Sequence, residues 1–239
     1  MTMKSDPNFL DLFVDVTRTI TSSLDPDLVF RLITEKIPKI IGVDAATIRL
    51  LDNSGQKLEL RAAHGLSEAY LNRGTIDTEE PIFKALSGEP IAIDDASQDP
   101  RIKFPEATKK EGIQTILVVP IPIRGQISGV LRLLTRTPRA YHQDEIDLVT
   151  AIGAQCGIAI ENARIFKEQQ IQLDYFKAIH EIGKKINTTY ALDTILDLIV
   201  TRLPEVMHLK AATIRLIAEN KGKLELKAAH GLSQSYLER

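Results

Sequence analysis

The stretch "AATIRLLDNSGQKLELRAAHGLSEAYLNR" at Ala45–Arg73 returns at Ala211–Arg239 as "AATIRLIAENKGKLELKAAHGLSQSYLER". The two copies align without a gap, since 211 − 45 and 239 − 73 both give 166. Apolar and polar residues alternate on both sides of the turn "DNSGQK", which predicts two antiparallel strands joined as a hairpin. The chain therefore contains a duplication, with one hairpin in each copy.

Two helices are predicted before each hairpin. In the first copy, apolar residues recur at helical spacing over 9–20, and Asp25-Pro26-Asp27 opens a second helix with an acidic cap and a proline in its first turn. Pro38 should kink or end that second helix, and Pro204 occupies the matching place in the second copy. The second copy has no counterpart of residues 74–170.

Beyond its hairpin, the first copy predicts a small sheet. Pro90–Ile93 is expected to be a brief strand, and the polar, proline-broken segment after it a partly helical loop. Two apolar strands, Gln114–Ile123 and Ile127–Leu134, flank the turn Arg124-Gly125-Gln126. These elements complete a sheet that the second copy lacks.

One long helix is predicted from His142 to about Thr189. No proline occurs between Asp144 and Ile182. At 1.5 Å per residue this helix would be roughly 70 Å long, more than twice the span of a small domain. We therefore expect a complete domain at 1–169, a connecting helix at 142–189 that both units share, and a truncated second domain at 170–239.

The first half of this helix has the spacing of a coiled-coil seam. Its apolar or small residues fall at alternating steps of three and four. Gly153 belongs to this seam, and we expect its other residues to form a homodimer interface: Ile146, Val149, Cys156, Ile160 and Ala163.

Composition removes several classes of function. The net charge is −2, which gives no electrostatic reason to expect a nucleic acid or an anionic membrane as partner. The single cysteine excludes an internal disulfide and fits a reducing compartment. The N-terminus has no signal-peptide pattern, and no apolar stretch has the length of a membrane span. A cytoplasmic protein without membrane contact is expected.

Strand alternation predicts a candidate binding face. It directs one set of side chains toward the helices, namely Ile48, Leu50, Leu58, Leu60, Leu131 and Leu133. The opposite face then carries Thr47, Arg49, Glu59, Arg61, Arg132 and Leu134. Three arginines on one face could bind a carboxylate or phosphate through paired hydrogen bonds. The alternative is that Glu59 and nearby aspartates pair with them on a solvated surface.

Three segments carry a resemblance to a known family: "GEPIAIDDASQDPR" at Gly88–Arg101, "ILVVPIPIRGQISGVLRLL" at Ile116–Leu134 and "YHQDEIDLVTAIGAQCGIAIENARIF" at Tyr141–Phe166. Together with the order of helices and strands, they resemble the GAF sensory domain, completely over about 9–167 and as a first half over 175–239. The resemblance implies an α+β, PAS-like antiparallel sheet with helices on one face and a small-molecule pocket on the other. Such domains usually lie upstream of a histidine kinase, a cyclase or a transcriptional activator.

The resemblance adds candidate ligand-binding residues in the segment that corresponds to the family's pocket loop. These are Asp94, Asp95, Asp99, Arg101 and Phe104. The same residues are equally well explained as turn formers. Family members that bind bilins or reduce methionine sulfoxide use a cysteine near the pocket, whereas Cys156 lies on the exit helix. Thr135-Arg136 stand where cyclic-nucleotide binders have an Asn-Lys pair, which argues against that ligand.

No catalytic or metal site is predicted. The five histidines, His64, His142, His180, His208 and His230, show no paired ligand spacing. No nucleophile, acid–base pair, phosphate-binding glycine loop or cofactor site is indicated, so we do not expect an enzyme. The sequence predicts a regulatory module that binds an unidentified small molecule and signals through a dimeric connecting helix. The alternative is a ligand-free dimerisation or spacer module.

Overall fold

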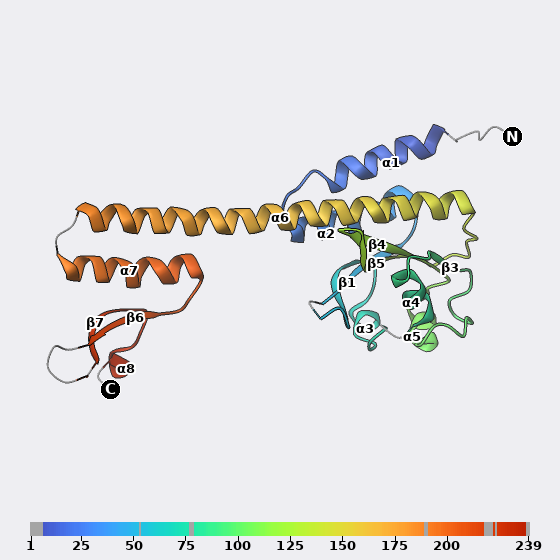
Figure 1. Ribbon diagram of the computed structural model, residues 1–239. Coiled ribbons are helices and arrows are strands. Elements are labelled where there is room, and N and C mark those ends of the chain that lie inside the picture. Colours follow the sequence, from blue (N-terminus) through green and yellow to red (C-terminus); the bar gives the residue numbers. More distant parts are fainter. Residues whose placement is uncertain are drawn as a thin grey trace. The chain divides into compact units, whose positions relative to one another are not determined.

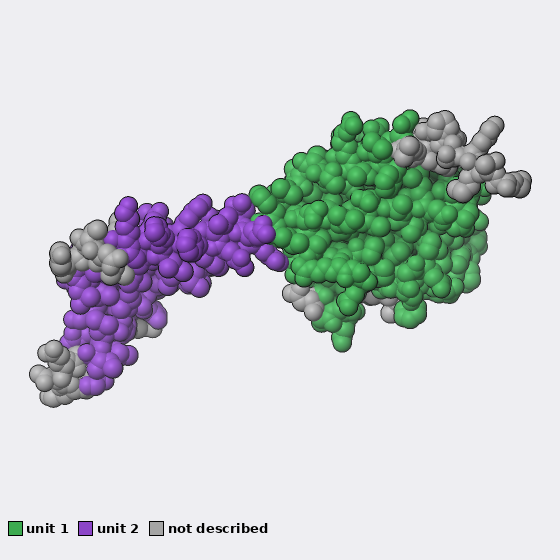
Figure 2. All heavy atoms as spheres, turned by 45° about the horizontal axis from the view of Figure 1, so that its top comes forward, with its two compact units in different colours: residues 1–167 green, residues 168–239 purple. Residues whose placement is uncertain are grey.

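The computed structural model describes residues 7–52, 54–76, 79–188, 191–217, 222 and 224–237, and Figure 1 shows their helices and strands. The chain divides into two compact units, Met1–Lys167 and Glu168–Arg239, which are coloured separately in Figure 2. We call them unit 1 and unit 2. The helix α6, Gln143–Thr188, is 46 residues long and passes from one unit into the other, which confirms the predicted long helix.

The described residues of unit 1 form ten further elements. Its helices are α1 (Pro7–Ile20), α2 (Pro26–Ile41), α3 (Glu68–Leu71), α4 (Glu80–Leu86) and α5 (Pro105–Glu111). Its strands are β1 (Ala45–Leu51), β2 (Leu58–His64), β3 (Ile91–Ile93), β4 (Thr115–Ile123) and β5 (Gln126–Thr135). The strands form one antiparallel sheet in the order β2-β1-β5-β4-β3. This α+β architecture is the predicted fold class.

Each face of the sheet is covered by helices. On one face, α1, α2 and the first part of α6 enclose a core that includes Ile33, Ile37, Leu117 and Leu131. On the other face, a second apolar core contains residues of the short helices α3 and α4 together with the sheet residues Val118, Val130 and Leu134. Figure 1 shows α3, α4 and α5 on the side of the sheet away from α6. The expected pocket face is therefore largely packed.

The β1–β2 pairing corrects one prediction. Its register shifts between Ile48 and Arg49, so β2 contains one more residue than β1 at this point. Such a bulge reverses which side chains share a face. Leu58 belongs to the second core, on the face opposite the long helices. Leu60 is exposed and pairs with Arg49 on that same face. Strict alternation was therefore wrong for Leu58 and Leu60.

The predicted dimer seam on α6 is also wrong. Its residues pack inside unit 1, against the sheet and α2: Val149, Cys156, Ile160 and Ala163 are buried in the first core, and Ile146 packs against it. A Cβ atom at Gly153 would lie only 2.6 Å from the carbonyl oxygen of Pro120 on β4, so this helix face approaches the strand closely. The regular spacing reflects a helix that covers its own sheet.

Unit 2 repeats the first elements of unit 1. Besides part of α6, it contains α7 (Leu192–Met207), β6 (Ala212–Ile217), β7 (Leu224–His230) and α8 (Gln234–Leu237). The β6–β7 register shifts between Ile214 and Arg215, as β1–β2 does between Ile48 and Arg49. Gly42 and His208 end α2 and α7 in the same left-handed conformation. The two copies thus share their backbone details as well as their sequence.

Candidate functional site: a buried arginine cluster

Two neighbouring strands place polar side chains beneath the short helices. Thr47 on β1 pairs with Arg132 on β5, and Arg49 on β1 pairs with Val130. Thr47, Arg49 and Arg132 are all buried, with only 3% of Arg132 exposed. Leu134 is buried on the same face. Strand alternation placed these four candidates correctly, because no bulge interrupts the β1–β5 ladder.

Three further residues join this site that the sequence analysis did not select. Tyr70 lies on α3, Arg73 follows α3, and Glu79 immediately precedes α4. The carbon at the centre of the Arg73 guanidinium lies 3.6 Å from the centroid of the Tyr70 ring. Arg73 Nη1 also donates a hydrogen bond of 2.5 Å to the Tyr70 carbonyl oxygen. One signal was available, because the repeat keeps Tyr and Arg at these two positions as Tyr236 and Arg239.

Glu79 supplies the negative charge of the site. Arg132 Nη2 lies 3.5 Å from Glu79 Oε2, and these side chains are 3% and 1% exposed. Glu79 is the N-cap residue of α4, yet its side chain makes no capping hydrogen bond. Its carboxylate therefore pairs with Arg132 and does not cap the helix.

The three arginines are close enough to influence one another. Burial lowers the pKa of Arg73, and the charges of Arg132 and Arg49 lower it as well, whereas Tyr70 and Glu79 act in the opposite direction. The described part of the site thus holds three guanidinium groups and one carboxylate. We refer to Thr47, Arg49, Tyr70, Arg73, Glu79 and Arg132 as the arginine cluster.

The cluster retains hydrogen-bonding capacity that the described protein atoms do not use. Buried atoms without a hydrogen-bond partner include Arg73 Nε, Arg132 Nε, Tyr70 Oη, Thr47 Oγ1 and Glu79 Oε2. Most buried polar groups in proteins are hydrogen-bonded, and leaving one unsatisfied costs about 1–3 kcal/mol. Five such atoms in one place are typical of a site that is built to bind something polar.

The predicted loop residues do not join the cluster. Asp94 and Asp95 are exposed, and Asp95 Oδ1 accepts a hydrogen bond of 2.7 Å from Ser97 Oγ within its own turn. Asp99 and Arg101 form a local ion pair of 2.5 Å, and the hydrogen bond from Arg101 lowers the pKa of Asp99. These contacts fit the turn-forming alternative, and a ligand-binding role for the four residues remains a prediction.

Two predicted ligand-binding residues, Arg61 and Phe104, do not lie in the arginine cluster. Arg61 lies at the β2 bulge and forms an ion pair of 2.9 Å with Glu59, and both side chains are more than two-fifths exposed. Arg61 therefore lies outside the cluster, and Arg73 is its third arginine. The Phe104 ring packs against Gly74, where a Cβ atom would lie 2.7 Å from the ring. Phe104 thus contributes to the second apolar core.

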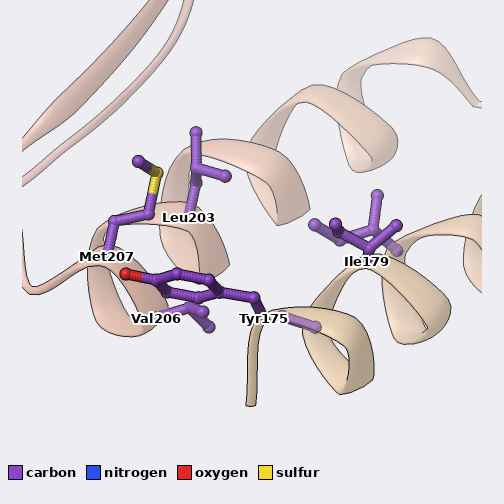
Figure 3. Close-up of a pocket in the computed structure, with 7 residues that line it drawn as sticks. Tyr175, Ile179, Leu203, Val206 and Met207 are labelled. Carbon is purple, nitrogen blue, oxygen red and sulfur yellow. The ribbon is translucent and has the colours of Figure 1, made fainter. Parts of the chain in front are cut away.

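An apolar pocket of about 240 Å³ lies in unit 2 (Figure 3). It is lined by Tyr175, Ala178, Ile179 and Ile182 of α6 and by Leu203, Val206 and Met207 of α7. The positions 166 residues earlier that match the α7 lining, Ile37, Ile40 and Ile41, belong to the helix-side core of unit 1. None of these described lining residues is charged. Side chains that belong to the core in unit 1 thus line a pocket at their matching positions in unit 2.

The described ranges contain no group of three or more side chains that could hold a metal ion. Among the helices that the structure describes, none combines the length and apolarity needed to cross a membrane.

The antiparallel sheet and the helices on both of its faces define an α+β domain, and the buried polar cluster is its candidate binding site. The family model of the GAF domain matches residues 25–160, which is more than half of the chain. The chain therefore belongs to the GAF domain family, as its motifs indicated.

Curated relatives are signalling and regulatory proteins. A dual 3',5'-cyclic-AMP and -GMP phosphodiesterase 11A of Takifugu rubripes is 24% identical over 216 residues, which span 84% of this chain and 23% of the relative. A formate hydrogenlyase transcriptional activator of Salmonella typhimurium is 24% identical over 166 residues, which span 66% of this chain and 24% of the relative. The matches thus span about a quarter of each relative.

Solved structures share the fold. The GAF domain of a phosphoenolpyruvate-protein phosphotransferase from Coxiella burnetii has a TM-score of 0.58 at 18% identity, covering 67% of this chain and 97% of that one. A bacteriophytochrome from R. palustris has a TM-score of 0.68 at 10% identity, covering 98% of this chain and 52% of that one. A sensor histidine kinase domain from Sinorhizobium meliloti is a further match, with a TM-score of 0.50 at 23% identity over 60% of this chain and 95% of that one.

Proposed function

We propose that this chain is the sensory part of a cytoplasmic signalling protein and binds a small molecule at the arginine cluster of unit 1. The observation that carries the proposal is the group of buried polar atoms without hydrogen-bond partners on one sheet face of a GAF domain. The chain would itself be non-catalytic and would regulate an effector of the kinase, cyclase or transcriptional-activator type. We further propose that unit 2 is the first half of a second GAF domain.

The ligand would act through the elements that it bridges. Arg132 lies on β5, whose chain continues into α6, while Arg73 and Glu79 lie beside the short helices α3 and α4. A molecule that contacts both sides can favour one packing of the short helices and of β5 over another. Such a signal requires that the ligand bind the two arrangements with different affinities.

Thermal unfolding of the 239-residue chain with a library of metabolites of every charge tests this proposal. A ligand at a hundred times its dissociation constant should add about 2.7 kcal/mol to the free energy of unfolding. The shift should disappear in Arg132→Gln and persist in Arg61→Gln, because Arg61 pairs with Glu59 outside the cluster. Absence of a shift with every compound, or an equal shift in both variants, would contradict the proposal.

A second candidate is the dimerising spacer, and exposed residues of α6 favour it. Ile158 and Ile165, seven residues apart, are 50% and 37% exposed, and Phe166 is 39% exposed. These residues form a stripe distinct from the buried seam that the sequence predicted. We propose this stripe as the contact between two copies.

Sedimentation velocity at micromolar concentration tests the stripe. The double variant Ile158→Glu/Ile165→Glu should be monomeric, because it introduces like charges at the centre of the contact. Lys167→Glu, an exposed position on the opposite side of the helix, should remain dimeric. A monomeric wild-type chain would exclude this candidate and leave ligand sensing untouched.

A further inference from the structure

We propose that the apolar pocket of unit 2 binds an amphipathic helix of the kind that the first half of α6 provides in unit 1. This inference rests on the proposal that unit 2 is the first half of a second GAF domain, and it names the kind of partner that this half binds. The partner is a helix with one apolar face and an arginine shortly before its first turn.

The pocket lies between two helices whose apolar side chains are incompletely covered. Ile179 of α6 is 68% exposed, and Leu203 and Met207 of α7 are 39% and 47% exposed. Figure 3 shows these three side chains on the two helices that line the pocket. Exposed apolar side chains gathered around a pocket are typical of a surface that binds another molecule.

Unit 1 shows which element covers the matching surface. The counterparts of these three pocket residues, 166 positions earlier, belong to the first core or pack against it: Phe13, Ile37 and Ile41. The same core contains Val149 and Ile152 of α6, and Ile146 packs against it. In unit 1 the apolar face of the first half of α6 therefore completes the core that α1 and α2 begin.

A polar contact joins the same elements in unit 1. Arg139, shortly before α6, donates hydrogen bonds of 3.3 and 3.1 Å from Nη1 to the carbonyl oxygens of Ile41 and Gly42 at the end of α2. The last carbonyl groups of a helix have no partner within it, and the helix dipole favours a cation there. Met207 and His208 occupy these two positions in α7, and His208 has the left-handed conformation of Gly42. An arginine ahead of the bound helix would thus find the same acceptors in unit 2.

These two contacts favour a helix over the other occupants of an apolar pocket. A small apolar molecule could fill the volume of about 240 Å³, but it would not pair with the carbonyl groups at the end of α7. A second copy of this chain could supply the first half of its α6 only by removing it from the core of its own unit 1. A separate helix of the same chemistry has neither disadvantage.

Fluorescence anisotropy tests the inference with a synthetic peptide of the sequence of residues 139–161, labelled at its C-terminus and titrated with the 239-residue chain under reducing conditions. We expect one-to-one binding. Leu203→Glu in the chain should weaken this binding at least about tenfold, because it introduces a charge into the apolar pocket. The control is Leu192→Glu, at a 57% exposed position at the other end of α7, which should leave the affinity unchanged.

Variants of the peptide test the same contact without altering the chain, and they decide the result should Leu203→Glu unfold unit 2. Val149→Glu changes the face of α6 that is buried in unit 1 and should weaken binding at least about tenfold. Ile158→Glu changes a position that is 50% exposed there and should bind as the unchanged peptide does. Arg139→Gln should weaken binding about tenfold, because it removes charge-assisted hydrogen bonds to the end of α7.

Several outcomes would overturn the inference. They are a wild-type chain that does not bind the peptide, a folded Leu203→Glu chain that binds it equally well, and equal affinities of the Val149→Glu and Ile158→Glu peptides. Sedimentation velocity without peptide adds a further one. A dimer that Leu203→Glu dissociates would show that a second copy occupies the pocket.

Failure of helix binding and failure of the half-domain proposal are distinguishable by amide hydrogen exchange on the wild-type chain. If β6 and β7 are protected as β1 and β2 are, yet the peptide does not bind, the half-domain proposal stands and the helix is wrong. If β6 and β7 exchange freely both with and without the peptide, the two proposals fail together.

Discussion

At the residue scale, the cluster depends on one carboxylate. Glu79 is the one acidic side chain that the described residues place among Arg49, Arg73 and Arg132. Removing one partner of a buried ion pair typically costs 3–5 kcal/mol, while an exposed pair contributes less than about 1 kcal/mol. The two glutamates at 59 and 79, both paired with arginines, should therefore respond very differently to neutralisation.

We expect Glu79→Gln to lower the free energy of unfolding of unit 1 by about 3 kcal/mol, because the buried Arg132 guanidinium loses the carboxylate that it pairs with. Glu59→Gln, at the exposed pair with Arg61, should change it by less than about 1 kcal/mol. Urea unfolding followed by circular dichroism measures both. Equal effects would show that the cluster is solvated.

Cys156 gives a second prediction at this scale. Burial raises the pKa of its thiol to about 12, compared with about 8.5 for a free thiol. The folded chain should therefore be inert to a thiol reagent at pH 8 and react after unfolding. The introduced thiol of Cys156→Ala/Lys167→Cys, at an exposed position of α6, should react at once.

The same shift makes stability depend on pH. Between about pH 8.5 and 12 the unfolded thiol loses its proton while the folded thiol keeps it. The contribution of Cys156 is therefore constant below that window and destabilises the fold as the pH rises through it. Cys156→Ala should remove this part of the alkaline loss, which urea unfolding at pH 7.5 and 9.5 would reveal.

At the element scale, two glycines of α6 have opposite roles. A Cβ atom at Gly157 would overlap the carbonyl oxygen of Pro122 on β4, whereas a Cβ at Gly183 would meet nothing within 4 Å. Alanine is favoured over glycine inside a helix by about 1 kcal/mol. At Gly157 the close approach of α6 to β4 outweighs this preference for alanine. At Gly183 no such contact opposes it.

Gly157→Ala should therefore destabilise unit 1 by about 2 kcal/mol, since the backbone of β4 has to move. Gly183→Ala should stabilise the helix by up to about 1 kcal/mol. Amide hydrogen exchange locates each effect, with faster exchange in β4 for the first variant and slower exchange around residue 183 for the second. Stabilisation by Gly157→Ala would refute the packing described here.

At the scale of the whole molecule, the two units differ in how completely they bury their apolar side chains. Ile37 of α2 is fully buried, while Leu203, its counterpart in α7, is 39% exposed beside the unit 2 pocket. The sheet of unit 1 has five strands, and the described sheet of unit 2 has two. The same helix is thus part of a complete core in one unit and of a partial one in the other.

We expect Ile37→Ala to lower the free energy of unfolding of unit 1 by about 3 kcal/mol, which lies within the range for a substitution that leaves a cavity in a core. Leu203→Ala should cost unit 2 about 1 kcal/mol or less, because much of that side chain already contacts water. Hydrogen exchange at β1 and β6 reports the two units separately. Equal losses would mean that Leu203 is covered in solution.

The sequence by itself determined the duplication, from the alignment of its two copies, and the family, from the resemblance of its motifs. It also determined the long helix and the strands, because these follow from local spacing that repeats every 3.6 or every two residues. It also placed Thr47, Arg49, Arg132 and Leu134 on one face, because an uninterrupted ladder preserves alternation.

Only the tertiary structure decided which arginines meet and which helix face is buried. The bulge at Ile48/Arg49 moved Arg61 out of the site, and chain folding brought Arg73 and Glu79 in from segments that share no strand with Arg132. The regular spacing on α6 could serve a second chain or its own sheet, and packing against β4 selected the sheet. Spacing along a chain records which side chains share a face, but not what that face contacts.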